Sequence, residues 1–250
     1  MAHPLLSVAG HTVLITGASR GIGRALAIGY AEAGATVLCL ARPSEALFSL
    51  IESLHAQGHQ AHAVPADLTT LSCAEILEDL PALNAVIHAA GLARHRPFGE
   101  MTRDDYAAVM ALNVEAPMFL TQAISQRWIS TNTPGSVVFI SSQLAHVGAS
   151  ERALYCGSKA ALEGITRGLA IELAPHGIRV NTLCPTFTLT EMTASALADP
   201  AFKAAVIGRI PLGRLGEPSD YLGACVLLTS PAGQMITGSS LRVDGGWTAQ

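Results

Sequence analysis

A glycine-rich stretch, Thr16-Gly17-Ala18-Ser19-Arg20-Gly21-Ile22-Gly23, directly follows the apolar run Val13-Leu14-Ile15 near the start of the chain. Its glycines permit a tight turn and a close approach of the backbone to a ligand. The residues after it form helices readily, and the free N–H groups at the start of a helix bind phosphate. Its spacing, Gly-x-x-x-Gly-x-Gly, differs from the general dinucleotide fingerprint. The stretch predicts a strand, a glycine turn and a helix. The turn either binds phosphate or serves only the packing of the helix on the strand.

Short apolar runs recur along the whole chain, and most are continuous, as in strands that are covered on both faces. Helix-forming stretches at 20–33, 44–57, 103–129, 153–174 and 218–229 separate them. Gly34, Gly58 and Gly177 follow three of these stretches, where a helix cap needs a left-handed residue. Alternating strands and helices predict an α/β fold with a parallel sheet flanked by helices on both faces. The runs are 13–15, 37–40, 61–64, 85–87, 137–140, 178–180 and 241–243.

The chain contains no linker or internal repeat, so residues 1–250 are expected to form a single domain. Residues 185–215 are the least regular segment and include Pro200 and Pro211. Such a segment after a strand is either a surface excursion or a lid over an active site.

Composition limits the classes of partner. Of the 250 residues, 50% are hydrophobic and 14% are charged, but Gly, Pro, Arg or His interrupts every apolar run before it reaches transmembrane length. No export signal precedes the domain, which predicts a cytoplasmic protein. A net charge of −4 with isolated arginines argues against nucleic acid and membrane partners and favours a small-molecule substrate. The five cysteines are spread apart, so neither a disulfide framework nor a metal site is expected.

Tyr155 and Lys159 lie four residues apart in a predicted helix. Residues at this spacing share a helix face, with Cβ atoms roughly 5–6 Å apart. A phenol normally titrates near pH ~10, and a neighbouring cation favours its ionised form. The pair predicts a proton donor and acceptor that works near neutral pH, with a surface pair of no chemical role as the alternative.

These motifs, together with Asn113 and Ser142, resemble the short-chain dehydrogenase/reductase family across nearly the whole chain. The resemblance implies a single Rossmann-type, doubly wound parallel sheet of about seven strands and an NAD(P)-dependent dehydrogenase or reductase. It implies that Ser142 hydrogen-bonds the substrate oxygen and that Tyr155 exchanges the proton. Lys159 would hold the nicotinamide ribose and lower the pKa of Tyr155. Asn113 would position a water that links Lys159 to solvent, whereas the adjacent Ser141 is interpreted as structural.

The choice of cofactor depends on the end of the second strand, where a carboxylate would favour NAD. Ala41 and Arg42 stand there, and a guanidinium binds phosphate, so we expect NADP, with NAD as the alternative. Arg42 could also simply face water. By resemblance, Asp67 accepts from the adenine amino group, although it could instead cap a helix. The other residues implied to bind the cofactor are Gly17, Ser19, Arg20, Gly21, Ile22, Gly23, Leu68, Ala90, Gly91, Tyr155, Lys159, Pro185, Thr188 and Thr190.

Two positions depart from the family pattern. His88-Ala89-Ala90-Gly91 stands where the family usually has Asn-Asn-Ala-Gly or Asn-Ala-Gly, so the asparagine that braces the sheet is missing. Pro185-Thr186 replaces the usual Pro-Gly, and the added side chain is expected to narrow the nicotinamide pocket or to alter its backbone.

The resemblance implies a pocket wall formed by residues 91–98, 143–152 and 186–192. Their hydrogen-bonding side chains suit a sugar, a polyol or a sugar acid, although each could be a solvated loop residue. The stretch Ser142-Gln-Leu-Ala-His-Val-Gly148 resembles bacterial sugar and polyol dehydrogenases of the family. The candidate substrate-binding residues are Arg94, Gln143, His146, Arg152, Thr186 and Phe187.

Two other functions remain open. A 3-oxoacyl-[acyl carrier protein] reductase shares the scaffold, but its acidic carrier needs a basic patch, and Arg127 and Arg167 form no cluster in the sequence. A non-catalytic, cofactor-sensing regulator would have lost the tyrosine or the lysine, and both are present. The family resemblance further implies a homotetramer.

Overall fold

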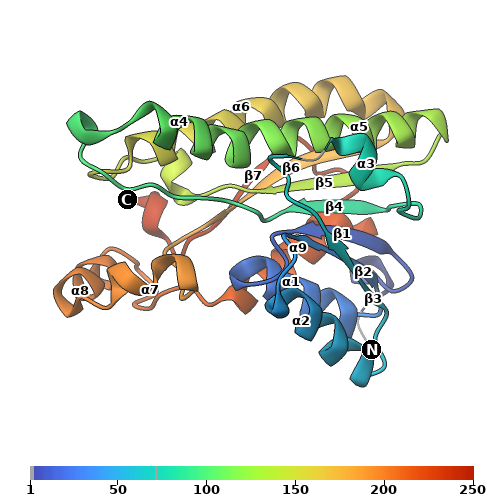
Figure 1. The fold of residues 1–250 in the computed structure, drawn as a ribbon, viewed down its shortest axis with the longest axis horizontal. Coiled ribbons are helices and arrows are strands. Elements are labelled where there is room, and N and C mark those ends of the chain that lie inside the picture. The colour runs from blue at the N-terminus through green and yellow to red at the C-terminus, as the bar shows by residue number, and fades with distance from the viewer. Residues whose placement is uncertain (1–2, 71) are drawn as a thin grey trace.

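The computed structural model describes residues 3–70 and 72–250 and places seven parallel strands in one sheet, in the order β3-β2-β1-β4-β5-β6-β7. Every predicted apolar run forms one of these strands, so the predicted doubly wound sheet is confirmed (Figure 1). The order reverses between β1 and β4, and in such sheets ligands bind at the carboxyl ends of the strands near this point. The strands are β1 (Thr12–Thr16), β2 (Thr36–Ala41), β3 (Ala61–Pro65), β4 (Ala85–His88), β5 (Gly135–Ile140), β6 (Ile178–Pro185) and β7 (Ser240–Val243).

Helices cover both faces of the sheet (Figure 1). One layer contains α3 (Cys73–Leu77), α4 (Arg103–Met110), α5 (Ala116–Ser130) and α6 (Ala153–Leu173). The opposite layer contains α1 (Gly21–Glu32), α2 (Glu45–Ala56) and α9 (Leu222–Thr229). Gly34, Gly58 and Gly177 have φ values of +85°, +83° and +70°, as predicted for left-handed helix caps. Short 3-10 helices are Pro4–Leu6, Phe98–Glu100, Gln143–Ala145, Ala174–His176, Pro218–Tyr221, Pro231–Gly233 and Trp247–Ala249.

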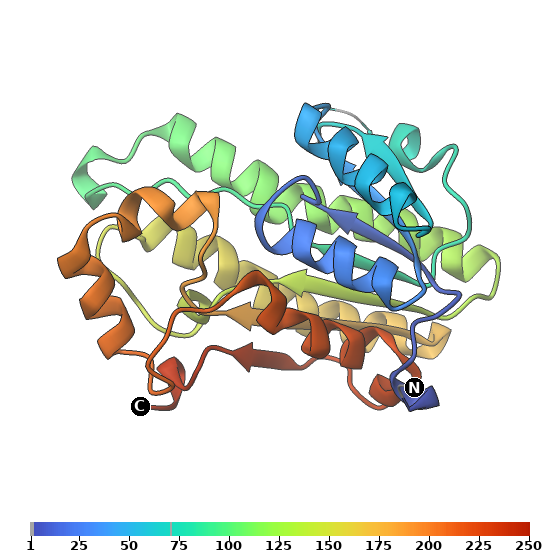
Figure 2. The same ribbon diagram turned by 90° about the horizontal axis from the view of Figure 1, so that it is seen from below.

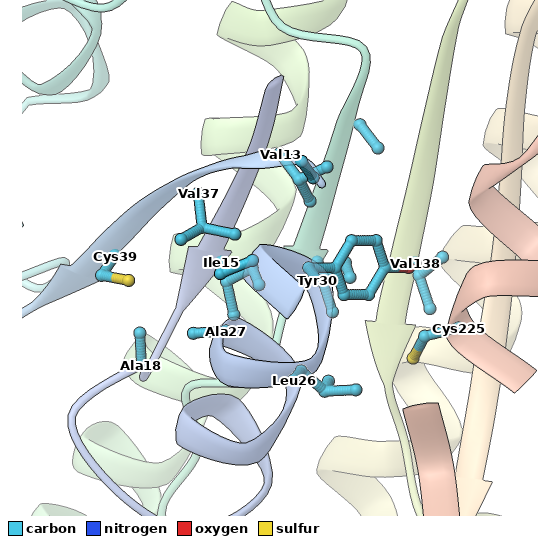
Figure 3. Packing of buried hydrophobic residues seen from close by; sticks show 14 of the residues in the cluster. Val13, Ile15, Ala18, Leu26, Ala27, Tyr30, Val37, Cys39, Val138 and Cys225 are labelled. Carbon is cyan, nitrogen blue, oxygen red and sulfur yellow. The ribbon is translucent and has the colours of Figure 1, made fainter. Parts of the chain in front are cut away.

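Two apolar clusters form the core around the sheet, one on each face, and a third packs α7 and α8 against Trp247. Val13 and Ile15 of β1 pack with Tyr30 of α1 on one face (Figure 3), whereas Leu14 packs with Trp128 of α5 on the other. Successive residues of a strand point to opposite faces, so a strand that is covered on both sides must be apolar throughout. The continuous apolar runs of the sequence have this origin.

α4 and α5 are joined by a π-helical turn, Ala111–Glu115, into the continuous helix Arg103–Ser130. Ala116 donates its N–H to the carbonyl of Ala111, five residues back, and Pro117 follows it with no N–H to donate. A single π turn of this kind is common at functional sites, and this one contains Asn113.

By length and composition this helix is apolar enough to cross a membrane, which the expectation from interrupted runs did not foresee. Core helices of soluble proteins meet the same criterion. Leu120, Ile124 and Trp128 are buried against the sheet, as in a core helix.

The segment 185–215 is more regular than expected, because it contains α7 (Glu191–Leu197) and α8 (Pro200–Gly208). Asp199 caps α8 by accepting from the N–H of Ala201 at 2.9 Å, and Pro200 occupies the first turn, where its missing N–H costs nothing. Both helices lie beyond the carboxyl ends of the strands (Figure 2).

Candidate active site

The glycine turn packs directly against the end of β4. Gly17 has a φ of +67°, and a Cβ at this position would lie 2.7 Å from the Cα of Ala90. A Cβ on Gly23 would collide with the carbonyl oxygen of Gly17. These glycines therefore serve packing, and the same close approach leaves the first N–H groups of α1 facing the carboxyl edge of the sheet. In the turn, Ser19 is half-buried and Arg20 is exposed, while Ile22 packs on the core.

A cavity of about 520 Å³ lies between α1 and α7. It brings together two of the predicted cofactor residues, because a Cβ on Gly21 would lie 3.4 Å from the Thr190 methyl carbon. Arg24 and Glu191 also line the cavity and were not predicted. Arg24 lies one helical turn after Arg20, and that spacing is the signal in the sequence that could have identified it.

Arg42 and Asp67 lie at the neighbouring ends of β2 and β3. Arg42 is exposed directly after Ala41, which pairs with Pro65. Asp67 accepts hydrogen bonds from the backbone N–H of Thr69 at 2.9 Å and from its hydroxyl at 2.7 Å. These bonds lower the pKa of Asp67, and the nearby Arg42 lowers it further. The Asp67 carboxylate thus shapes the turn after β3, where the sequence predicted either an adenine contact or a helix cap.

Tyr155 and Lys159 lie on one face of α6, as their spacing predicted. The ammonium nitrogen of Lys159 is 5.7 Å from the centre of the Tyr155 ring. Lys159 is only 4% exposed, and its Nζ donates to the carbonyl oxygen of Ile140, the last residue of β5, at 2.8 Å. The lysine is therefore held between its own helix and the carboxyl end of the central sheet.

Ser142 and Ser141 have different environments. Ser142 begins the 3-10 helix Gln143–Ala145, where its hydroxyl accepts from the N–H of Leu144 at 3.1 Å. It is also near enough to Tyr155 to affect the pKa of that phenol. The Ser141 hydroxyl donates to the backbone oxygen of Lys159 at 3.5 Å.

Asn113 is 1% exposed and holds the loop that follows β4. Its Oδ1 accepts from the N–H of Leu92 at 2.7 Å, and its Nδ2 donates to the Leu92 oxygen at 2.9 Å and to the Ser158 hydroxyl at 3.0 Å. A Cβ on Gly91 would lie 3.5 Å from Asn113 Oδ1 and 3.7 Å from Lys159 Nζ. Asn113 thus clamps the loop beside the lysine, a role that the sequence did not predict.

Among the predicted substrate residues, Gln143 and Thr186 have polar atoms without partners. Gln143 is 1% exposed, and neither Nε2 nor Oε1 makes a hydrogen bond within the described chain. The Thr186 hydroxyl is also buried without a partner. Buried polar groups are normally paired, so these two are available for a ligand.

The other four predicted substrate residues make contacts within the protein. Arg94 is exposed, and it lowers the pKa of Asp105 less than the hydrogen bonds with Thr102 and the charge of Arg96 do. The guanidinium carbon of Arg152 lies 5.9 Å from the ring centre of Phe202 in α8. Phe187 packs on Trp247, with ring centres 5.5 Å apart.

His146 turns its Nε2 toward the Ser240 hydroxyl, 2.9 Å away. His95 also lies in the predicted pocket wall. Its ring stands edge to face with Tyr155 at 6.1 Å.

Comparison with known proteins agrees with this geometry. A family model described as enoyl-(acyl carrier protein) reductase matches residues 17–248. The chain is 34% identical over 247 residues to 5-keto-D-gluconate 5-reductase of Escherichia coli (strain K12), with 97% of each chain covered. It is 36% identical over 254 residues to gluconate 5-dehydrogenase of Gluconobacter oxydans (strain 621H), with 99% of each covered.

A crystal structure of a gluconate 5-dehydrogenase from Burkholderia cenocepacia, in complex with NADP and tartrate, matches with a TM-score of 0.94. The identity is 29%, over 99% of this chain and 98% of that one. The chain belongs to the short-chain dehydrogenase/reductase family. It is accordingly an NAD(P)-dependent oxidoreductase.

The structure shows what occupies the place of the family's missing asparagine. His88 is buried at the end of β4, where its Nε2 lies 2.9 Å from the Thr121 hydroxyl and its ring stacks on Phe139 at 5.0 Å. Burial lowers the pKa of His88 to about 3, so the ring is neutral. The Thr16 hydroxyl accepts from the N–H of Ala90 at 3.1 Å and ties β1 to the loop after β4. A histidine on β4, bound to a threonine on α5, and a threonine on β1 thus brace this part of the sheet.

The second departure from the family pattern lies at the start of the segment 185–215. Thr186 directly follows Pro185, the last residue of β6, and has no left-handed backbone, since Asn132 and Glu151 are the only non-glycine residues with positive φ in the described ranges. The hydroxyl of Thr188 bridges the Thr186 carbonyl at 2.8 Å and the Tyr221 hydroxyl at 2.5 Å. The bridge anchors the start of the segment 185–215 and uses the hydroxyl of Thr188, a residue that was predicted to bind cofactor. Leu68 likewise packs on the apolar core.

Burial dominates the pKa values of the catalytic pair. It raises the pKa of Tyr155 to about 12, against the lowering effect of the Ser142 hydroxyl. Burial also lowers the pKa of Lys159 to about 8, which Cys184 and Glu163 oppose. The expected lowering of the tyrosine pKa by the lysine is therefore wrong for this structure. Desolvation of the phenol outweighs a cation whose hydrogen bond goes to Ile140.

Proposed function

We propose that this chain catalyses the NADP-dependent interconversion of a secondary alcohol and a carbonyl in a sugar acid, a sugar or a polyol. The observation that carries the proposal is the pairing of Tyr155 with the buried Lys159 on α6, close to Ser142. Structural and regulatory proteins have no need to bury a phenol and an ammonium together, because each loses hydration there. A non-catalytic regulator is thus disfavoured.

The residues at the carboxyl edge of the sheet fit a dinucleotide. The backbone contact of Gly17 with Ala90 leaves no side chain over the turn, and the cavity beside α1 runs from Gly21 to Thr190. We propose that this edge binds the pyrophosphate and that Arg42, exposed directly after the last residue of β2, binds a 2′-phosphate. The nicotinamide supplies or accepts the hydride when it is bound.

The protein residues handle the proton. At neutral pH Tyr155 is protonated, since its pKa is about 12, and it can donate to the developing alkoxide during reduction. Ser142 holds the same substrate oxygen and keeps it within reach of the phenol. Lys159 retains its positive charge below its pKa of about 8 and stabilises negative charge on the phenolate during oxidation. Asn113 keeps the loop after β4 in place beside the lysine.

A hydroxylated, anionic substrate suits the polar groups of the cleft. Gln143 and Thr186 offer unpaired buried hydrogen-bonding atoms, and Gln143 directly follows Ser142. The two relatives named above are a 5-keto-D-gluconate 5-reductase and a gluconate 5-dehydrogenase, and the Burkholderia structure holds tartrate, a hydroxylated dicarboxylate. A 3-oxoacyl-[acyl carrier protein] reductase has less support, because Arg127 binds the carbonyls of Leu77 and Leu80 and cannot form a basic docking patch.

The experiment measures initial rates with NAD and NADP separately against gluconate-type acids, polyols and 3-oxoacyl thioesters. The proposal expects NADP-dependent turnover of a sugar acid or polyol. Turnover of acyl thioesters alone would replace the substrate class, and a tenfold preference for NAD, about 1.4 kcal/mol, would overturn the role of Arg42. Unchanged turnover in Tyr155→Phe would overturn the mechanism.

We further propose that residues 1–250 act as a single domain, with 185–215 as its lid, in a cytoplasmic homotetramer. One sheet with a core on both faces supports the single domain. Met118 and Phe119 on α5 and Ile171 on α6 are exposed apolar side chains, as in a face that pairs with another copy. Sedimentation analysis at micromolar concentration tests the assembly, and a monomer would contradict it. Cell fractionation tests the compartment.

A further inference from the structure

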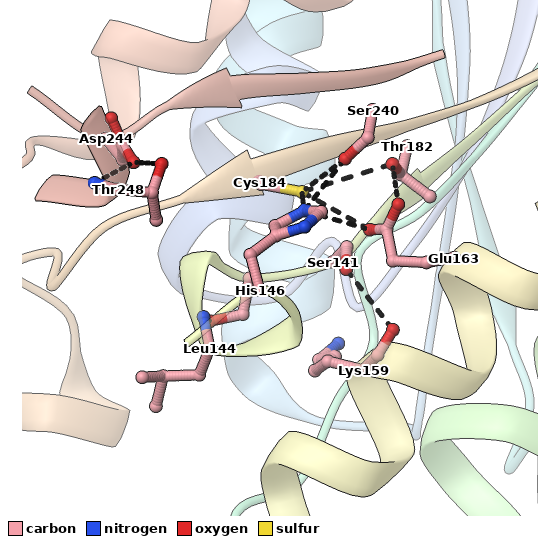
Figure 4. Close-up of polar contacts among 11 residues, drawn as sticks. Ser141, Leu144, His146, Lys159, Glu163, Thr182, Cys184, Ser240, Asp244 and Thr248 are labelled. Atoms are coloured by element: carbon pink, nitrogen blue, oxygen red, sulfur yellow. Dashed lines mark hydrogen bonds and ion pairs between the residues drawn. The ribbon is translucent and has the colours of Figure 1, made fainter. Parts of the chain in front are cut away.

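Three potential metal ligands that are far apart in the sequence converge near Lys159 (Figure 4). His146 follows the 3-10 helix after β5, Glu163 lies on α6 one turn beyond Lys159, and Cys184 is on β6. Their ligand atoms all lie within 4.8 Å of one another. No metal site was predicted from the sequence, because no two of these residues are close neighbours along the chain.

The separations between the three ligand atoms suit one small ion. Cys184 Sγ lies 3.5 Å from His146 Nε2 and 3.3 Å from Glu163 Oε1, and the nitrogen and oxygen are 3.9 Å apart. Zinc binds sulfur at about 2.3 Å and nitrogen or oxygen at about 2.0–2.2 Å. Tetrahedral geometry at those lengths places the ligand atoms about 3.3–3.6 Å from each other. A zinc ion between them requires adjustments of only a few tenths of an ångström.

Neighbouring groups hold the ligands in this arrangement. The Thr182 hydroxyl donates to Glu163 Oε2 at 3.0 Å, which orients the carboxylate and leaves Oε1 directed at Cys184. Ser240 Oγ lies 2.9 Å from His146 Nε2 and 3.3 Å from Cys184 Sγ, on the open side of the cluster. Partners of this kind typically change metal affinity by about 10–100-fold when they are mutated.

Charge and access also favour a divalent ion. The Glu163 side chain is 6% exposed, and within the described chain its one ion-pair contact is with His146, at 3.9 Å. A carboxylate and a thiolate with a neutral imidazole carry two negative charges, which one dication balances. The His146 side chain is 27% exposed and gives the ion a route from solvent. A set of N, S and O ligands selects zinc rather than the all-oxygen environments of calcium and magnesium.

We propose that His146, Glu163 and Cys184 form a zinc site with three protein ligands and a fourth position beside Ser240. On binding, zinc forms bonds to the Cys184 sulfur, His146 Nε2 and a Glu163 oxygen. The Cys184 S–H bond breaks heterolytically, and its proton leaves to solvent without any change in oxidation state. The ion links α6, β6 and the segment after β5. The site does not depend on the proposed oxidoreductase function.

Spectroscopy and competition test the site on the full chain. The protein is stripped with a chelator and titrated with Co²⁺, which reports a bound thiolate by charge-transfer absorption, and then with Zn²⁺ against a chromogenic chelator. We expect one ion per chain and displacement of Co²⁺ by Zn²⁺. Cys184→Ser should abolish the charge-transfer band, and His146→Asn should weaken zinc binding at least tenfold. The matched control is Cys73→Ser, at a partly buried cysteine on α3, which should bind as the wild type does.

Two outcomes would overturn the proposal. One is a wild-type protein that shows no thiolate band with Co²⁺. The other is a Cys184→Ser variant that binds zinc as tightly as the wild type. Because Cys184 is buried and its replacement could disturb folding, Thr182→Val provides a second test. It removes the hydroxyl that orients Glu163 and should lower zinc affinity about 10–100-fold while circular dichroism stays unchanged. An unchanged affinity in both Thr182→Val and His146→Asn would equally exclude the site.

Discussion

Replacing Gln143 by methionine should stabilise the free protein. Gln143 is 1% exposed, and neither its amide nitrogen nor its oxygen has a hydrogen-bond partner among residues 3–70 and 72–250. A buried polar group left unsatisfied costs about 1–3 kcal/mol. Methionine has a similar length and fills irregular space without needing a partner. We expect Gln143→Met to raise the free energy of unfolding by about 1–3 kcal/mol, which corresponds to about 2–4 °C in Tm for each kcal/mol in a chain of this size.

The same substitution should impair catalysis if the amide binds the substrate. A hydrogen bond to a charged group contributes about 1.5–3 kcal/mol, so kcat/KM for a sugar acid should fall about 10–150-fold. The paired measurements are urea or thermal unfolding and steady-state kinetics. Gln126→Met is the control, because Gln126 is exposed on α5, and this variant should change neither quantity measurably.

The test depends on the direction of change in both the free energy of unfolding and kcat/KM. A variant with lower stability and unchanged kcat/KM would show that the amide is satisfied inside the folded protein and does not contact substrate. Lower stability with lower activity would indicate a structural role. Only higher stability together with lower activity fits a side chain that is held unpaired for its ligand.

Further predictions concern the proton donor, the cofactor and pH. Tyr155→Phe should lower kcat/KM about 10²–10⁴-fold while leaving the Tm and NADP binding near the wild-type values, as checked by kinetics and calorimetry. Arg42→Asp should shift the NADP-to-NAD ratio of kcat/KM toward NAD by at least about tenfold, since an acid repels the 2′-phosphate. The pKa of Lys159 is lowered from 10.5 to about 8, so between these values the unfolded chain binds the extra proton and stability rises with pH. The free energy of unfolding of the wild type should rise by about 1.4 kcal/mol per pH unit in that window relative to that of Lys159→Met. An equal pH dependence of the two free energies would contradict this prediction. Because the pKa of Tyr155 is about 12, kcat/KM for oxidation should rise about tenfold per pH unit from pH 6 to 8, whereas reduction should stay nearly flat.

The sheet could be predicted from the sequence because burial on both faces leaves a strong pattern. Runs such as Val13–Ile15 have no polar residue, and only a strand between two helical layers requires that. Gly34, Gly58 and Gly177 marked helix ends correctly, since a left-handed backbone at those points excludes most other residues. Local chemistry is enough for both predictions.

The elements that were not predicted depend on contacts between distant residues. The π-helical turn that contains Asn113 has no pattern of its own, and the bonds from Asn113 to Leu92 and Ser158 join three separate segments. α8, by contrast, has a local signal of its own. A proline after an Asp cap is typical of a first helical turn, although a proline also occurs in irregular segments. The spacing of Tyr155 and Lys159 was informative for the opposite reason, since one helix fixes their separation.

Burial acts on the two catalytic groups in the same sense, because it disfavours the charged form of each. The consequences nevertheless differ: Tyr155, with a pKa of about 12, keeps its proton at neutral pH, and Lys159, with a pKa of about 8, keeps most of its positive charge. The site at rest therefore holds a phenol that is ready to donate, beside a cation that is ready to stabilise the phenolate left behind. Reduction starts from this state directly, whereas oxidation must first remove the phenolic proton. The burial that makes the phenol a poor base at pH 7 thus makes it a suitable acid, and the neighbouring lysine carries the charge that lets the same pair work in both directions.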